Sequence, residues 1–248
     1  AILTQSLILG GTMKKGTKII GLILAVVLLM TATVFGTLAY LQATTDQLKN
    51  TFTVGKVEIA LDEARTNTSG QPLDSNGTLV SDRKSAERYD GSTGKTGNEY
   101  HLVPGKVYTK DPTVTVDKDS EDSYVFVKVI NNLEYKVNRT NKTLEAASDS
   151  SYSTISQQIT GSPNSWTALT GVDNVYYKKF TNDPNATADT KWEVFTLFKI
   201  SDDVTNDQFT EYTTNVQSAD QVITIKAYAI QSEGFADAKT AWDAGKFS

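Results

Sequence analysis

The fold class follows from the stretch YVFVKVI at residues 124–130. β-branched and aromatic residues such as these favour strands, because their side chains pack well on a pleated surface. Successive side chains of a strand point to opposite faces, so Val125, Val127 and Val129 share one face. We therefore predict a buried strand here, in a protein built mainly from β-sheets.

Strand patterns continue on both sides of this stretch. We expect further strands within residues 107–116, 175–180, 191–200 and 222–231. One face of the last carries Ile223, Ile225, Ala227 and Ala229. Only two short helices are expected, around residues 145–158 and 236–244. Short strands joined by turn-rich loops predict an all-β fold, an antiparallel sandwich with long loop insertions and one or two short helices.

A first strand is expected to end near residue 61. Its apolar positions are Phe52, Val54, Val57, Ile59 and Leu61. The alternation shifts by one residue at Gly55, which predicts a β-bulge. Residues 64–100 follow; they are polar, rich in Gly, Ser, Asn, Asp and Arg, and show almost no apolar periodicity. We predict that they form a long, flexible insertion.

An export signal precedes this strand. Lysines at positions 14, 15 and 18 form a basic region, and an apolar run at residues 19–38 follows. Thr37 and Ala39 occupy the −3 and −1 positions of a signal-peptidase site, so cleavage is expected before Tyr40. A retained membrane anchor is the alternative, since the run is close to the length that crosses a bilayer.

These signals divide the chain into three parts. Residues 1–12 contain no start Met and are interpreted as a mis-annotated leader, residues 13–39 as a signal helix and residues 40–248 as one secreted domain. The chain has no cysteine, which excludes disulfides and thiolate chemistry. Its net charge is −5, and residues 1–39 carry lysines but no acidic residue, so the exported part is more acidic still. Such a surface argues against nucleic acid as a partner.

Two N-terminal segments resemble the TasA/camelysin family of exported proteins: GTLAYL at residues 36–41 and NTFTVG at residues 50–55. Two further stretches fit the same family, LVPGK through KDP at residues 102–112 and AYAIQSEGF at residues 227–235. Together they cover both ends and the middle of the chain. The resemblance implies a jelly-roll β-sandwich, a signal cut by a SipW-type peptidase and secretion into the biofilm matrix of a bacterium.

The resemblance also implies that subunits polymerise head to tail into fibres. Each subunit would donate its N-terminal strand, with Phe52, Val54, Val57 and Ile59, to the sheet of the next. Other matrix proteins or polysaccharide are further partners that it suggests. The residues themselves give independent support, because a strand-like segment behind a released terminus is suited to strand addition at an exposed sheet edge.

A second function implied by the resemblance is that of a camelysin-like cell-surface metalloprotease. A catalytic zinc site usually takes two or three histidines and an open position, whereas the chain has only His101. Four spaced acidic residues are weak candidates for a Ca²⁺ site: Asp117, Asp119, Glu121 and Asp122. They lack the Gly and the terminal Glu of an EF-hand loop, and we interpret them as a solvated turn. We predict no enzyme activity and no cofactor.

A third function left open is that of an adhesin or carbohydrate-binding module, with Tyr176 and Tyr177 as an aromatic face. The segment GSTGKT at residues 91–96 resembles a phosphate-binding loop, but Tyr89 stands where the first Gly is required. Aromatic residues expected in the core are Phe126, Trp166, Trp192, Phe195, Phe198, Tyr228 and Trp242. Turn or helix-capping roles are expected for Asp202, Asp203 and Asp207.

Overall fold

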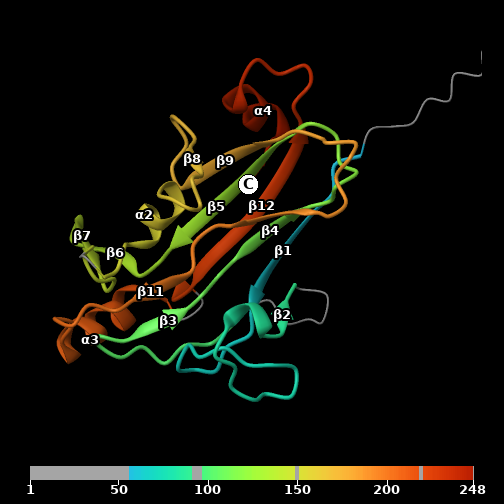
Figure 1. Cartoon of the computed structure of the whole chain (residues 1–248). Helices are drawn as coiled ribbons and strands as arrows, with labels where there is room; N and C mark the ends of the chain where they lie inside the picture. The colour runs from blue at the N-terminus through green and yellow to red at the C-terminus, as the bar shows by residue number, and fades with distance from the viewer. Residues whose placement is uncertain (1–55, 91–96, 149–150, 218–219, 248) are drawn as a thin grey trace, which may run out of the picture. The chain divides into compact units, whose positions relative to one another are not determined.

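The stretch at residues 124–130 forms most of β5 (Ser123–Asn131), an inner strand of a four-stranded antiparallel sheet (Figure 1). This computed structural model describes residues 56–90, 97–148, 151–217 and 220–247. The order of the sheet is β12–β5–β9–β8. Its other strands are β12 (Ile223–Gln231), β9 (Val175–Phe180) and β8 (Thr167–Ala168).

A second four-stranded antiparallel sheet has the order β10–β4–β1–β2. Its strands are β10 (Thr190–Glu193), β4 (Thr113–Val116), β1 (Ile59–Ala64) and β2 (Arg88–Tyr89). Two small sheets pair β11 (Leu197–Lys199) with β3 (Val107–Thr109), and β6 (Glu134–Val137) with β7 (Thr140–Thr143). The predicted class, mainly antiparallel β structure, is confirmed for the described residues.

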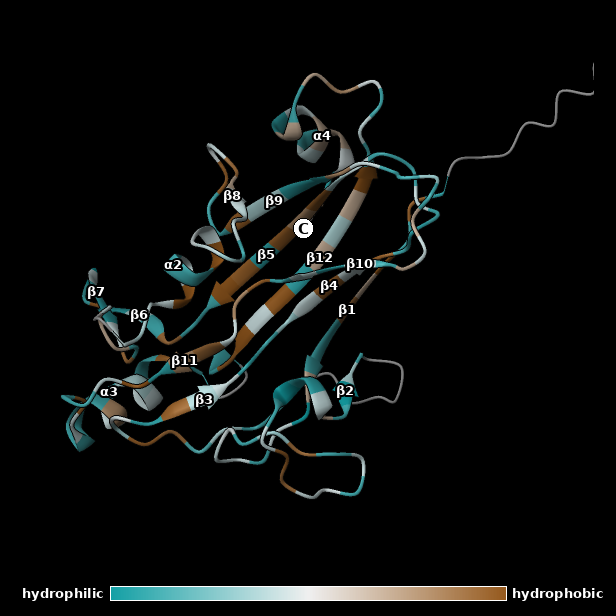
Figure 2. Cartoon of the chain, viewed as in Figure 1, coloured by the Kyte–Doolittle hydropathy of each residue, from teal (hydrophilic) through white to brown (hydrophobic). Residues whose placement is uncertain are grey.

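The two larger sheets share one hydrophobic core. Val125, Val127 and Val129 of β5 are buried in the same cluster as Val114 and Val116 of β4. Figure 2 shows the hydrophobic residues concentrated along β5 and part of β12. The predicted apolar face of β12 packs against this cluster through Ile223, Ile225, Ala227 and Ala229. The face assignments made from the alternation of both strands are therefore confirmed.

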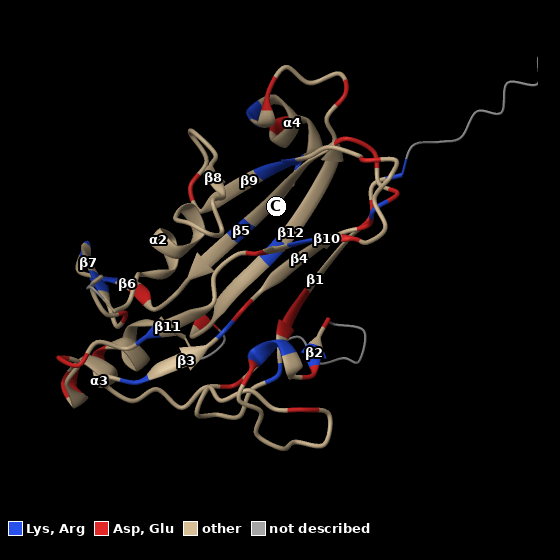
Figure 3. Cartoon of the chain, in the orientation of Figure 1, with Lys and Arg blue, Asp and Glu red and all other residues tan. Residues whose placement is uncertain are grey.

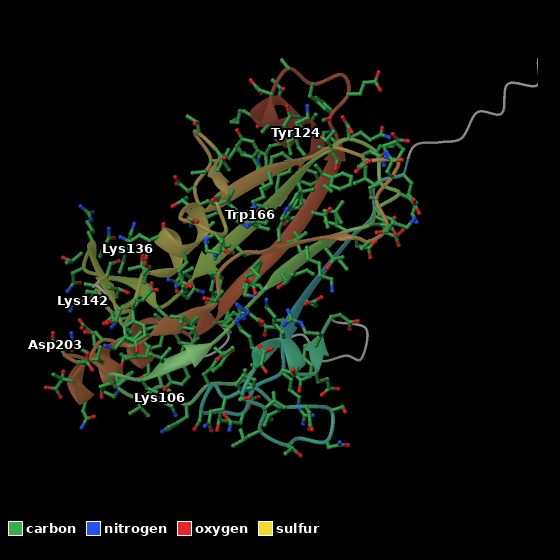
Figure 4. The ribbon with its side chains drawn as sticks, in the orientation of Figure 1. Lys106, Tyr124, Lys136, Lys142, Trp166 and Asp203 are labelled. Atoms are coloured by element: carbon green, nitrogen blue, oxygen red, sulfur yellow. The ribbon has the colours of Figure 1, made fainter. Side chains whose placement is uncertain are left out.

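The aromatic residues expected in the core are buried or packed against it. The buried ones are Phe126, Trp166, Phe195, Phe198 and Trp242. Trp192 and Tyr228 are half-buried against the core clusters. Trp166 lies in the interior (Figure 4), where its indole N–H donates to the carbonyl of Glu193 at 2.9 Å. Its one polar atom is therefore satisfied by a neighbouring strand.

The described residues contain three short α-helices, so the prediction of one or two was wrong. They are α2 (Ile155–Thr160), α3 (Asn206–Asn215) and α4 (Ala238–Gly245). The helix predicted at 145–158 coincides with α2 only at residues 155–158. Its predicted start is not helical, because Glu145 forms a β-bridge with Ile200. The prediction missed α3, which is rich in Thr and Asn of low helix propensity. Its capping box, Thr205 with Gln208, was the available start signal.

Two expected strands are each divided in two. The strand expected at 107–116 consists of β3 and β4, interrupted at Pro112, which has no N–H for a ladder. The strand expected at 191–200 likewise consists of β10 and β11. The interruptions let β3 pair with β11 in one small sheet while β4 pairs with β10 in the larger one.

Within the described residues, the first strand ends later than expected. β1 begins at Ile59, after the half-buried Val57, and it extends to Ala64 because its last two residues pair with β2. Several predictions lie outside the described residues: Phe52, Val54, the bulge at Gly55, the cleavage residues Thr37, Ala39 and Tyr40, and all of residues 1–39. In the part of the chain that is described, no helix is both long and apolar enough to span a membrane.

The insertion predicted at 64–100 contains defined structure in residues 64–90. It holds a 3₁₀ turn (Arg83–Ser85), β2, and bridges that join Thr66 to Pro72 and Leu73 to Leu79. Gly70 has a φ of +74°, and a Cβ on it would lie 2.7 Å from the Cα of Tyr108. Only glycine permits both this conformation and this approach, which docks the insertion on β3. Flexibility of the insertion stays a prediction.

Candidate functional site

A groove of about 1090 Å³ is lined by the edges of β1 and β12, whose backbones contact each other. β1 contributes Ile59, Ala60 and Leu61, and β12 contributes Ile223, Thr224 and Ile225. Further apolar lining comes from Tyr100, Leu102, Leu133 and Phe198. The groove therefore joins two strand edges to side chains of the main core.

The edge of β1 at the groove carries backbone groups that have no strand partner among the described residues. β1 pairs with β4 along Ile59–Asp62, and with β2 only at Glu63 and Ala64. Hydrogen-bonded pairs alternate along an antiparallel ladder, and the Asp117 N–H donates to the carbonyl of Glu58 at 3.0 Å. By that alternation, Ile59 and Leu61 direct their N–H and carbonyl groups to the open edge.

β12 presents an open edge by the same reasoning. Within the described ranges it pairs only with β5. The Ser232 N–H donates to the carbonyl of Asp122 at 2.8 Å, so the even-numbered residues of β12 bond to β5. Ile223 and Ile225 then direct their backbone groups to the open edge, while their side chains pack on the core. An extended peptide in the groove would meet backbone partners and apolar contacts together.

One end of the groove is polar and holds a buried ion pair. The Lys110 ammonium lies 2.5 Å from the Glu63 carboxylate, and these side chains are only 7% and 10% exposed. The Asn98 amide donates to the same carboxylate at 2.9 Å. Nearby, burial raises the pKa of the Tyr100 hydroxyl far above its ordinary value, and that hydroxyl donates to the Thr109 carbonyl. The groove is therefore apolar at the Ile59 end and charged at the Glu63 end.

A second set of ion pairs fixes β2 beside β1; we call it the Arg88 clamp. The Arg88 guanidinium lies 2.5 Å from Asp62 and 2.8 Å from Asp111, which is almost fully buried. The Asp111 carboxylate also accepts the Ala64 N–H at 2.7 Å. Burial lowers the pKa of Arg88, but the hydrogen bonds and charges of Asp111 and Asp62 outweigh it and raise that pKa overall. Figure 3 shows basic and acidic residues close together where β1 meets the insertion.

The four weak Ca²⁺ candidates lie on the turn between β4 and β5, as the alternative interpretation predicted. Asp117 accepts the Asp119 N–H at 2.8 Å, and Asp122 accepts the Asn182 N–H at 2.7 Å. Among the described residues, no group of three or more His, Cys, Asp or Glu side chains is placed to hold a metal ion. The loop at 91–96 lies outside the described ranges. Asp202 and Asp203 lie in a turn, and Asp207 is in the first turn of α3.

His101 lies in an exposed loop before the turn at Pro104. Its backbone N–H donates to the Thr68 carbonyl at 2.8 Å, and its carbonyl accepts the Tyr108 hydroxyl at 2.5 Å. These bonds anchor the main chain of the loop and leave the imidazole on the surface. These backbone hydrogen bonds explain the position of His101 without a catalytic role.

The aromatic pair proposed for carbohydrate binding does not form one face. Tyr176 and Tyr177 are consecutive on β9, so their side chains point to opposite faces of the sheet. Tyr176 packs on the main core, whereas Tyr177 packs in the second cluster with Phe126 and Trp242. The prediction that these two residues form a shared aromatic face is therefore wrong.

The polar end of the groove was not found from the sequence. Lys110 and Asp111 belong to a stretch that was noted only for its resemblance to a family, and Glu63 and Arg88 border the insertion. The available signal was a charged pair at 110–111 between two strand-like runs and directly before a proline. Their partners lie 47 and 23 residues away in the chain, so spacing alone did not connect them.

The groove offers two strand edges and an apolar lining that ends at buried charges, a geometry suited to an extended polypeptide. A scan of protein-family models found no match to the chain, and neither a search of curated proteins nor a search of solved structures found a similar one.

Proposed function

We propose that this protein is a secreted subunit of extracellular matrix fibres, belongs to the TasA/camelysin family and has a jelly-roll β-sandwich. In this proposal the groove between β1 and β12 accepts the N-terminal strand of another subunit. The observation that carries it is the pair of open strand edges on one apolar groove. Two antiparallel sheets over a shared core are also what a sandwich requires.

The proposed donor is the segment at residues 50–54, with Phe52 and Val54 as its apolar side chains. Val57 and Ile59, which were also expected in the donor strand, are left out of it, because Ile59 pairs with Val116 of its own subunit and Val57 comes just before β1. The donor lies a few residues before β1 in the sequence, so each subunit carries both a donor and an acceptor. Such a contact joins two different surfaces and does not close on itself, so it propagates as a filament. Release of Tyr40 from the signal helix by a SipW-type peptidase would free the donor.

The donor cannot fill its own groove through a tight hairpin. Residues 56–58 already continue the line of β1, because the Lys56 carbonyl accepts the Glu121 N–H at 2.9 Å. A two-residue turn at 54–55 would place Phe52 opposite Val57, which does not line the groove. A parallel arrangement would need a crossover of about a dozen residues or more. The geometry thus favours a donor from another subunit.

The energies are sufficient for a stable contact. Each backbone hydrogen bond of the added strand contributes about 0.5–1.5 kcal/mol net. Full burial of Phe52 or Val54 contributes about 1.5–3 kcal/mol each. Ordering of the donor and loss of subunit freedom oppose these gains. The preformed groove reduces the opposing terms, because only the donor has to be ordered.

The test is electron microscopy of the purified secreted protein and of a Phe52→Asp/Val54→Asp variant. The native protein should form fibres, and the variant should remain monomeric because a charged donor cannot enter an apolar groove. A matched control is Leu79→Asp/Val103→Asp, which alters two exposed apolar side chains outside the groove. This control should form fibres normally. Fibres from the donor variant at the native rate would show that the proposed assembly is wrong.

A further inference from the structure

We infer that β2 and the Arg88 clamp form a stop that fixes the register of the strand accepted by the groove. The inference rests on the proposed function, because it concerns how the donor of a second subunit sits in the groove between β1 and β12. It assigns a role to the insertion at 64–90, which the proposed function leaves without one.

The first argument is the limited length of open edge on β1. Ile59 and Leu61 direct their backbone groups to the groove, but Glu63 is the next residue with that orientation and it pairs with Tyr89 of β2. An incoming strand can therefore follow β1 only as far as Asp62. β12 runs antiparallel to β1 and begins at Ile223 near this point, and its open edge extends the other way, toward Gln231 beside the turn that binds Lys56. Pairing with β2 closes the β1 edge at Glu63, and this end point can define a register.

The second argument is that β2 is held firmly against β1. The Arg88 clamp ties β2 to Asp62 of β1 and to the buried Asp111. The preceding Glu87 bonds Arg65 both through its carboxylate, at 2.8 Å, and through its carbonyl, at 2.7 Å. An incoming strand would have to break these bonds to displace β2. The short β2 therefore keeps its pairing with Glu63, and the donor cannot pair there.

The third argument is the change of chemistry at the same point. A donor that advanced by two residues would bring an apolar side chain from the Leu61 side to the Glu63–Lys110 pair. Both charges would then lose remaining solvent without gaining a partner, which is unfavourable. A shift by one residue would instead turn the whole apolar set outward. The stop and the buried pair therefore favour the same single register.

Disulfide cross-linking can read the register directly, because the native chain has no cysteine. Ala60 on β1 is exposed and serves as the acceptor position. The positions expected to face outward are Thr51 and Thr53 of the donor and Lys49 just before it, since they alternate with Phe52 and Val54. Residues directly opposite on paired strands have Cα separations that permit a disulfide. Three proteins, each with Ala60→Cys and one donor cysteine, are assembled, oxidised and analysed on non-reducing gels.

With the stop intact, one of the three donor positions should give a ladder of linked subunits. Two variants then remove the stop separately. Arg88→Ala breaks the clamp, and Tyr89→Pro removes an N–H from the β2 ladder while keeping the clamp. In either folded variant, the ladder should spread to the neighbouring donor position, two residues away. Lys142→Ala is the control, because it breaks a 2.6 Å ion pair between β7 and Glu211 of α3, and Lys142 does not line the groove (Figure 4).

The outcomes separate the inference from the proposed function. A ladder that stays at one donor position in both stop variants, or disappears in both, overturns the stop while the proposed function stands. No ladder from any of the three proteins with the stop intact overturns the proposed function, and the stop with it. Circular dichroism of each monomer identifies the folded variants that enter the comparison.

Discussion

Replacing Lys110 by methionine should destabilise the protein strongly. Methionine keeps most of the length of the lysine stem but removes the ammonium. The Glu63 carboxylate, whose side chain is only 10% exposed, then has no cation beside it. Breaking a buried ion pair from one side costs about 3–5 kcal/mol, because an uncompensated charge remains buried. The Asn98 amide still donates to that carboxylate at 2.9 Å, so we expect a loss near the lower limit.

A double variant tests the physical reason. Adding Glu63→Gln to Lys110→Met removes the unpaired charge and keeps a carbonyl that can accept from Asn98. We therefore expect it to recover more than half of the loss caused by Lys110→Met. Urea denaturation followed by tryptophan fluorescence measures both values, with midpoint and slope determined separately. A loss below about 1 kcal/mol for Lys110→Met would contradict the buried-charge argument. No recovery in the double variant would instead assign the loss to packing.

Four further predictions follow from the same structure and sequence. Burial raises the pKa of Glu145 above its ordinary 4.5, although hydrogen bonds from Ile155 and Asn131 lower it. Since the folded state then binds the proton more tightly, Glu145 should cost stability as the pH rises from 4.5 through its folded pKa. Denaturation at several pH values should show the native protein losing stability relative to Glu145→Gln across that window. Trp242→Ala should cost about 3–5 kcal/mol, because the ring packs 5.2 Å from Phe126 and 5.7 Å from Tyr228. Its control Lys239→Ala on the same helix should change stability by less than about 0.5 kcal/mol in thermal unfolding. N-terminal sequencing of secreted material should begin at Tyr40 or within two residues, and recovery only in membranes would favour the anchor. Purified protein should cleave no peptide with or without added Zn²⁺; turnover lost in His101→Ala would favour the protease instead.

Local patterns were sufficient for the strands that face the core. In β5, Val125, Val127 and Val129 share a face that is buried in the main core, and the corresponding face of β12 packs half-buried against that core. This follows from the alternation of side chains along any strand, which needs no knowledge of the partner. Strand ends were less predictable. The strand expected at 107–116 is divided because β3 and β4 find partners in different sheets, which is a property of the whole fold.

The helix α3 shows the limit of local propensity. Its Thr and Asn residues disfavour a helix, yet Tyr212 is buried in the main core and stacks edge-to-face with Tyr135 at 5.3 Å. Tertiary burial and the Thr205–Gln208 capping box therefore outweigh a weak propensity. The separation of Tyr176 from Tyr177 has a simpler cause, since adjacent residues of one strand cannot share a face.

By itself the sequence determined the antiparallel β class, the faces of the central strands and the single histidine that limits metal chemistry. Only the tertiary structure decided where the open edges lie and how the groove between them ends. The Glu63–Lys110 pair and the Arg88 clamp join residues 47 and 23 positions apart, and each is buried only because two sheets and an insertion meet there. Charged residues are mostly exposed in folded proteins, so a sequence alone predicts that they face solvent. The burial of these charged side chains follows only from how the chain packs.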